Sequence, residues 1–89
     1  MTRTITLTLF EDPGHGWVRF PKQRLVKLGI AAKITHYSYE RNGMAFLEED
    51  CDLSTLANAL QDKGYEIKFK TNRSNRSSKI RSYCQYRNI

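Results

Sequence analysis

The residues best suited to chemistry lie in the last quarter of the chain, where basic side chains gather without any acid. Residues 67–89 contain seven lysines and arginines and neither aspartate nor glutamate. Residues 1–66 carry eight basic and nine acidic side chains, so the formal net charge of +6 arises in this C-terminal segment. Such a charge asymmetry favours binding to a polyanion or to an acidic protein surface.

The same segment has the side chains that phosphate contacts use. Between residues 72 and 79, arginines are interleaved with asparagines and serines. Arginine forms bidentate hydrogen bonds to phosphate, small polar side chains satisfy other acceptors, and nearby tyrosines could stack on bases. The candidate binding residues are Lys68, Lys70, Arg73, Arg76, Lys79, Arg81, Tyr83 and Arg87. A nucleic acid, an acidic protein and simple solvation of a surface loop remain open as interpretations.

A secondary acidic patch consists of Glu48, Glu49, Asp50 and Asp52. Several carboxylates could bind a divalent cation, but such ligands usually come from separated segments, and only Glu11 and Asp12 offer further acid. Negative charge also favours the N-terminus of a helix, which Asp52 is expected to cap. The patch could equally meet the basic segment of a second copy in a homodimer. We therefore expect no metal site here.

Four side chains have the types that ligate zinc: His15, His36, Cys51 and Cys84. No two of them lie at the short spacing that is typical of a zinc site. Neither cysteine stands in a nucleophile elbow or beside a glycine-rich oxyanion loop. We expect reduced thiols, no cofactor and no enzymatic activity.

Hydrophobic periodicity predicts the elements that must position these residues. Residues 4–10 alternate isoleucine or leucine with threonine, which is typical of a half-buried strand. Leucines at positions 53, 56 and 60 have helical spacing, and Gly64 follows as a stop. Strands are expected at residues 4–10, 17–20, 35–40, 44–48, 65–70 and 80–84, and helices at 21–28 and 53–63.

This order, ββαββαβ(β), predicts an α+β fold: a small single domain over residues 1–89, with a mostly antiparallel sheet of five to six strands and two helices on one face. A flexible basic loop is expected at residues 71–78. Ile67 and Phe69 are expected to pack against Leu56 and Leu60. Neither a membrane span nor an export signal is apparent, so we expect a protein of the host-cell cytoplasm.

Several motifs extend over nearly the whole chain: Asp12-Pro13-Gly14-His15-Gly16-Trp17, Leu28-Gly29-Ile30, Tyr37-Ser38-Tyr39, Leu47-Glu48-Glu49-Asp50-Cys51-Asp52 and Ser78-Lys79-Ile80-Arg81-Ser82-Tyr83. On these motifs the chain resembles a family of small proteins carried by phages, prophages and plasmids. The resemblance implies a genetic context and no assigned activity. Small proteins of mobile elements commonly act by binding, either to genes or to host enzymes and defence complexes.

A second resemblance is local. The run from Gly16 to Lys22, followed by Leu28-Gly29-Ile30, is similar to the hairpin of AbrB-type and antitoxin DNA-binding domains. It implies DNA contacts by exposed basic residues, which here would be Arg19, Lys22, Arg24 and Lys27. Ala32-Lys33 replaces the usual Gly-Asp of that family, and the similarity covers a third of the chain.

From these observations we expect a small basic binding protein of a mobile genetic element, which engages nucleic acid or a nucleic-acid-binding complex through its C-terminal segment. The alternative is a protein inhibitor of a host defence or restriction system, whose partner would be a host protein or ribonucleoprotein complex.

Overall fold

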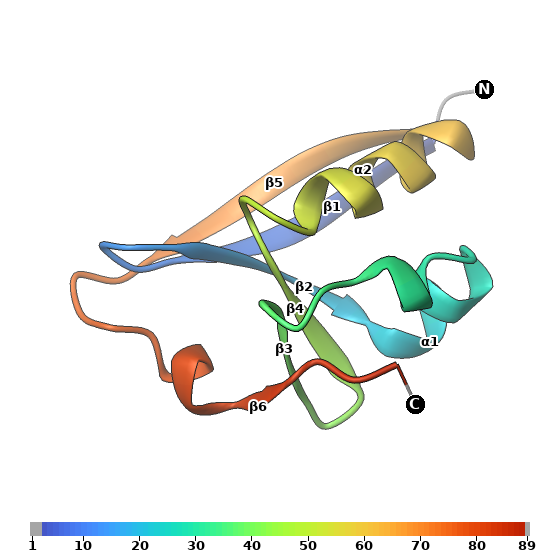
Figure 1. The fold of residues 1–89 in the computed structure, drawn as a ribbon. Helices are drawn as coiled ribbons and strands as arrows, with labels where there is room; N and C mark the ends of the chain where they lie inside the picture. Colours follow the sequence, from blue (N-terminus) through green and yellow to red (C-terminus); the bar gives the residue numbers. More distant parts are fainter. Residues whose placement is uncertain (1–2, 89) are drawn as a thin grey trace.

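Six strands form one mixed sheet in the computed structural model of the chain, which describes residues 3–88 (Figure 1). Their order across the sheet is β5-β1-β2-β4-β3-β6. β1 and β5 run parallel, and every other neighbouring pair is antiparallel. The strands are β1 Arg3–Glu11, β2 Gly16–Pro21, β3 Tyr39–Arg41, β4 Met44–Glu48, β5 Tyr65–Arg73 and β6 Cys84–Gln85.

Two α-helices and two 3-10 turns complete the described part of the chain. They are α1 Lys22–Lys27, η1 Ala31–Lys33, α2 Leu53–Asp62 and η2 Lys79–Ser82. Side chains of both α-helices enter the same hydrophobic core, so the helices cover one face of the sheet (Figure 1). The predicted α+β class and element order are therefore confirmed. Within residues 3–88, no helix has the length and apolar character needed to cross a membrane.

The main core lies between the helices and the sheet. Side chains alternate along a strand, so every second residue of β1, β2 and β4 faces this core. Leu56 and Leu60 of α2 lie four residues apart, on one face of the helix, and both are completely buried. The buried residues of this core include Leu7, Leu9, Val18, Phe20, Leu25, Ala45, Leu47, Leu56 and Leu60.

A smaller apolar cluster lies on the opposite side of the sheet, which we call the outer face. Trp17, Phe46 and Ile80 are buried there, with exposures of 2%, 8% and 3%. Ile80 belongs to the crossing segment, defined here as residues 74–85. This segment leaves β5 at one edge of the sheet and pairs with β3 at the other edge through β6 (Figure 1).

Two glycine turns fix the ends of elements, as the sequence predicts. Gly29 has a φ of +76° and ends α1, and the amide of the next residue, Ile30, donates to the carbonyl of Leu25 at 3.0 Å. Asn42 and Gly43 have φ values of +53° and +79°, which is the left-handed pair that a two-residue hairpin turn requires. The second turn sets the register of β3 on β4.

Four local expectations are wrong. The strand expected from residue 35 begins only at Tyr39. The strand expected at residues 80–84 is mostly the 3-10 turn η2, and β6 is only Cys84–Gln85. β5 continues to Arg73, because backbone hydrogen bonds to the parallel β1 do not depend on the polarity of residues 71–73. Phe69 is 48% exposed, although its partner Leu7 in the register faces the core, whereas Ile67 packs against that core.

Candidate nucleic-acid interface

Basic and aromatic side chains form a row across the outer face of the sheet. In the strand register, Lys70 lies beside Thr8, Thr8 beside Arg19, and Arg19 beside Phe46. Directly paired residues point to the same face of a sheet. Lys70 and Arg19 are separated by two strand spacings of about 4.8 Å each, so they flank a surface about 10 Å wide. Lys68 extends this row along β5, beside Thr6.

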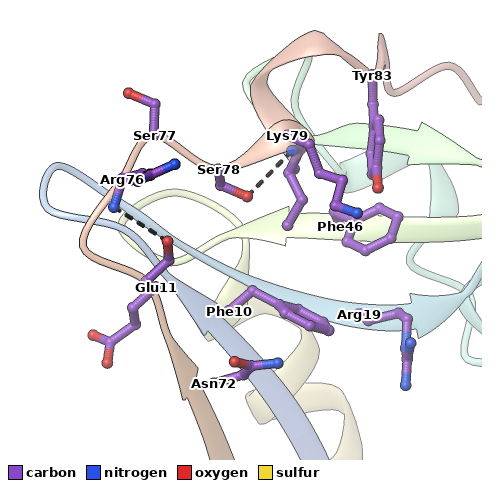
Figure 2. Close-up of a pocket in the computed structure, with 12 residues that line it drawn as sticks. Phe10, Glu11, Arg19, Phe46, Asn72, Arg76, Ser77, Ser78, Lys79 and Tyr83 are labelled. Carbon is purple, nitrogen blue, oxygen red and sulfur yellow. Dashed lines mark hydrogen bonds between the residues drawn. The ribbon is translucent and has the colours of Figure 1, made fainter.

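This row leads into a groove of about 600 Å³ between the sheet and the crossing segment (Figure 2). Phe10 and Phe46 form its floor, with their ring centroids 6.2 Å apart. The guanidinium of Arg19 lies over the ring of Phe10, at 5.5 Å from its centroid. The other lining residues are Glu11, Asn72, Ser74, Arg76, Ser77, Ser78, Lys79, Ile80 and Tyr83.

The cations around the groove differ in whether they already have an acidic partner. Arg73 forms an ion pair with Glu11 at 3.3 Å. The side chains of Lys68, Lys70, Arg76 and Lys79 form no ion pair with any residue in the described range 3–88. Four positive charges therefore remain available to an external anion.

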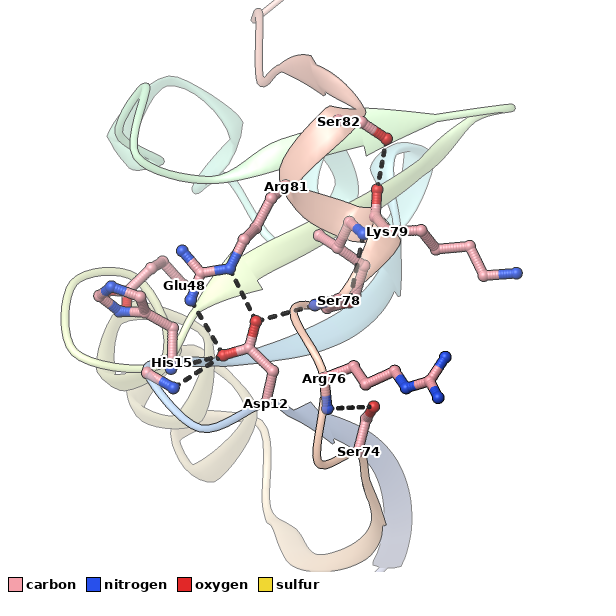
Figure 3. A network of polar contacts seen from close by, with 11 residues as sticks. Asp12, His15, Glu48, Ser74, Arg76, Ser78, Lys79, Arg81 and Ser82 are labelled. Atoms are coloured by element: carbon pink, nitrogen blue, oxygen red, sulfur yellow. Dashed lines mark hydrogen bonds and ion pairs between the residues drawn. The ribbon is translucent and has the colours of Figure 1, made fainter.

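Arg81 belongs to a different environment, although it comes from the same basic segment (Figure 3). Its guanidinium donates two hydrogen bonds to the carboxylate of Asp12, at 2.7 and 2.9 Å, and lies 5.3 Å from the centroid of the Trp17 indole. The Asp12 carboxylate, fully buried, also accepts from three backbone amides, those of Gly14, His15 and Ser78. The guanidinium is thus committed to an internal contact that anchors the crossing segment.

This network strongly favours the ionised form of Asp12. The hydrogen bonds from Arg81, followed by the amide of Ser78, hold the pKa of Asp12 far below its usual range despite its burial. In return, the Asp12 carboxylate raises the pKa of Arg81. The pair therefore stays charged throughout the neutral pH range.

The two remaining candidate binding residues, Tyr83 and Arg87, lie apart from one another. Tyr83 lines the groove and packs on Phe46 with a centroid distance of 5.1 Å. Arg87 lies beyond β6, where its amide donates to Glu40 at 2.7 Å. It is not among the residues that line the groove.

The acidic patch does not form one exposed surface. Glu48 and Asp52 are buried, whereas Glu49 is half-buried and Asp50 is exposed. Burial, together with the nearby carboxylates, raises the pKa of Glu49. Only part of the patch can therefore meet an external partner.

Asp52 holds a connecting loop instead of capping α2. It stands at the N-cap position, but its side chain makes no capping hydrogen bond. Its carboxylate accepts from the amide and hydroxyl of Thr35, at 3.1 and 2.8 Å, and from the hydroxyl of Ser38. The expectation of a side-chain cap was wrong, because the carboxylate is engaged by Thr35 and Ser38 of the loop before β3.

Sequence reasoning from the residues missed the aromatic floor of the groove. Phe10 ends the alternating run of β1 on the threonine side, and Phe46 pairs with Arg19 across β2 and β4. Strand alternation could have placed Phe10 on the outer face, but only the strand order places it beside Arg19. Arg19 itself was expected to contact DNA from the AbrB-type resemblance.

The other residues implied by that resemblance lie elsewhere. Lys22 forms an ion pair with Glu40. Arg24 lies over Phe20, a residue of the main core, at 4.9 Å from the ring centroid. Arg24 and Lys27 are exposed on α1, which is on the helical side of the sheet.

Both cysteines are free thiols on the surface. The neighbouring Glu48 carboxylate, with burial and the other surrounding carboxylates, raises the pKa of Cys51. A raised pKa disfavours the thiolate, which is the nucleophilic form. The surroundings of Cys51 therefore suit an unreactive thiol.

The geometry as a whole suits binding of an extended anion with planar groups. Arg76 and Lys79, which form no ion pair with a described residue, line the groove. Its floor is aromatic, and its wall carries serine hydroxyls and an asparagine amide. Comparisons of the chain with protein-family models, with curated proteins and with solved structures find no match.

Proposed function

We propose that the protein binds single-stranded nucleic acid across the outer face of its sheet. The observation that carries this proposal is a row of cations that leads into a groove with an aromatic floor. Lys68 and Lys70 lie on the outer face of β5, and Arg76 and Lys79 line the groove. None of the four forms an ion pair with a residue in the range 3–88. Positive charge supplies affinity for phosphates, and exposed rings supply surfaces on which bases stack.

The phosphate contacts would follow β5 and the crossing segment. Lys68 and Lys70 lie two residues apart on the same face of a strand, so their Cα atoms are about 7 Å apart. Arg76 and Lys79 line the groove at the end of this row, among hydroxyl donors. A strand of nucleic acid that runs along β5 and into the groove would meet these four cations in turn.

The aromatic floor favours a single strand over a duplex. Bases within a duplex are already stacked on one another, whereas unpaired bases can lie on aromatic or guanidinium planes. Phe10 and Tyr83 are half-buried, so part of each ring is accessible, and Arg19 covers one side of Phe10. Each base stacked on such a ring contributes about 1–3 kcal/mol.

Fluorescence anisotropy with labelled single-stranded and duplex oligonucleotides tests the proposal. We expect the single strand to bind more tightly, with log K falling against log salt at about −0.7 for each phosphate neutralised, hence a slope of roughly −3. K68E/K70E and R76E/K79E should each abolish binding at moderate salt. The matched control is K27E/K63E, which makes the same charge change at exposed lysines away from the groove.

Three outcomes contradict the proposal. They are equal loss of binding in the control and groove variants, a preference for duplex, and no affinity for any nucleic acid at low salt. In the last case K68E/K70E becomes the probe for an acidic protein partner, in affinity purification from nuclease-treated lysate. A protein interface with an apolar centre depends much less on salt.

A further inference from the structure

A second pocket opens on the outer face, separate from the groove, and it gathers three side chains that can ligate a metal. Its volume is about 330 Å³, and Trp17 and Tyr39 form part of its wall. His15, Glu48 and Asp50 each offer one ligand atom, and the three atoms lie within 4.8 Å of one another. The pairing of β2 with β4 brings them together, since Trp17 lies beside Glu48 and the amide of Glu49 donates to the carbonyl of Gly16.

One buried carboxylate oxygen of Glu48 lacks a hydrogen-bond donor among the described residues, which points to a ligand. The Glu48 side chain is 9% exposed, and Oε2 accepts from the amide of Asp50 at 3.0 Å. Oε1 is also buried but accepts no hydrogen bond from any residue in the range 3–88; it lies 3.4 Å from Nδ1 of His15. A buried carboxylate oxygen without a partner is costly. A cation between these two atoms would satisfy it.

We propose that His15, Glu48 and Asp50 bind a divalent transition-metal ion of the zinc class. Ligand atoms that share a tetrahedral zinc at about 2.1 Å lie roughly 3.4 Å apart, which is the spacing between His15 and Glu48. One imidazole nitrogen and two carboxylate oxygens suit zinc, cobalt or manganese, whereas magnesium and calcium prefer oxygen ligands only. The remaining coordination positions are left to water.

The local charge supports a cation here. Arg81 also lines this pocket, but its charge is matched by the buried carboxylate of Asp12. Glu48 and Asp50 then supply the negative charge for the ion. From the sequence, these residue types were recognised separately but not joined, because zinc prediction relies on short ligand spacings and His15 is brought to the two acids only by the sheet.

Trp17 provides a direct readout of the site. It is the only tryptophan in the chain, and its ring centroid lies 6.1 Å from that of His15. Cobalt(II) bound beside it should quench its fluorescence. In a titration of the untagged protein we expect saturable quenching at one cobalt per chain, reversed by excess zinc and by a chelator, and unchanged by millimolar magnesium.

Conservative variants assign the ligands. H15Q, E48Q and D50N should each weaken cobalt binding at least about ten-fold, whereas H36Q, at the other exposed histidine, should not. Because E48Q alters a buried residue, its fold is checked by circular dichroism, and the exposed His15 variant decides if E48Q does not fold. Quenching that never saturates, or that H15Q leaves unchanged, overturns the proposal. Because the groove is separate from this pocket, K68E/K70E should lose nucleic-acid binding and keep cobalt binding. Failure of the metal proposal is therefore distinguishable from failure of the proposed function.

Discussion

Two arginines of the basic segment show how much the surroundings of a residue decide its role. Arg76 lines the groove with no ion pair to a described residue, whereas Arg81, five positions later, is held by the buried Asp12. Exposed charges contribute little to stability. A buried carboxylate depends strongly on its partner, because removing the partner leaves its charge uncompensated.

The first prediction separates stability from binding. Arg81→Ala should lower the Tm clearly, because it leaves the Asp12 carboxylate buried without its cation. Arg76→Ala should leave the Tm nearly unchanged and weaken oligonucleotide binding. Thermal melts and anisotropy on both variants check this. Equal melting of the two variants would show that the Asp12–Arg81 pair does not anchor the crossing segment.

The second prediction concerns acid. The pKa of Asp12 is held far below its usual value, first by the hydrogen bonds from Arg81. A lowered folded-state pKa contributes stability that is complete above the unfolded value of about 4 and is lost as the pH falls below it. The midpoint of urea unfolding, measured with a chelator present, should therefore decline from pH 4 towards pH 2.

Asp12→Asn is the matching variant for this pH dependence. It should unfold at lower urea at neutral pH, yet lose less between pH 4 and pH 2 than the wild type does. Some acid dependence should remain, because burial of Glu40 is outweighed by Lys22 and Arg87, which lower its pKa too. Identical acid dependence in the variant and the wild type would contradict the role of Asp12.

At the scale of single residues, the sequence indicates which side-chain types are present but not which residues they contact. The clustering of lysine and arginine after residue 67 marks the face that carries the groove. The pairing of Asp12 with Arg81 spans 69 positions, and no local pattern distinguishes Arg81 from Arg76. The burial of Glu48 and Asp52 within an acidic run likewise depends on contacts that form only when β4 and the loop before β3 meet.

At the scale of elements, β5 shows what an alternating pattern can and cannot predict. Ile67 and Phe69 both fall on the helical face of the strand, as the alternation predicts. Only Ile67 packs against the main core; Phe69 lies further along β5 and is 48% exposed. The strand was predictable, but the reach of α2 over it was not.

The third prediction compares these two side chains. Ile67→Ala should reduce the free energy of unfolding by about 1–3 kcal/mol, since it removes part of a packed side chain. Phe69→Ala should cost less than about 1 kcal/mol, because Phe69 is already 48% exposed and lies outside the main core. Urea titrations of the two variants measure the difference. A larger loss for Phe69→Ala would mean that the ring is covered in solution.

Other features of the helices and strands also fall into those that the sequence predicts and those that it does not. The Asn42-Gly43 hairpin and the Gly29 end of α1 were predictable, because left-handed backbone conformations select those residues. The parallel pairing of β5 with β1 leaves no such local mark. It follows from the α2 crossover, and it extends β5 through residues 71–73, which read as loop by polarity alone.

At the scale of the whole molecule, the sheet separates two apolar clusters with different partners. The main core is closed by both helices, whereas the cluster of Trp17, Phe46 and Ile80 is covered by the crossing segment. That segment also lines both sites, since Ser78 and Ile80 line the groove and Arg81 lines the His15 pocket. Both proposed sites therefore depend on how it is seated.

The last prediction tests this dependence at Ile80, which is 3% exposed and packs in the outer-face cluster with Trp17 and Phe46. Ile80→Ala should cost about 2–4 kcal/mol and shift Trp17 emission to longer wavelength, because water then reaches the indole. Oligonucleotide binding and cobalt quenching should both weaken, since the groove and the pocket share this segment. Ser77→Ala, on the exposed part of the same segment, is the control and should keep the emission maximum. If Ile80→Ala leaves emission and both binding activities intact, the two sites are independent of the seating of the crossing segment.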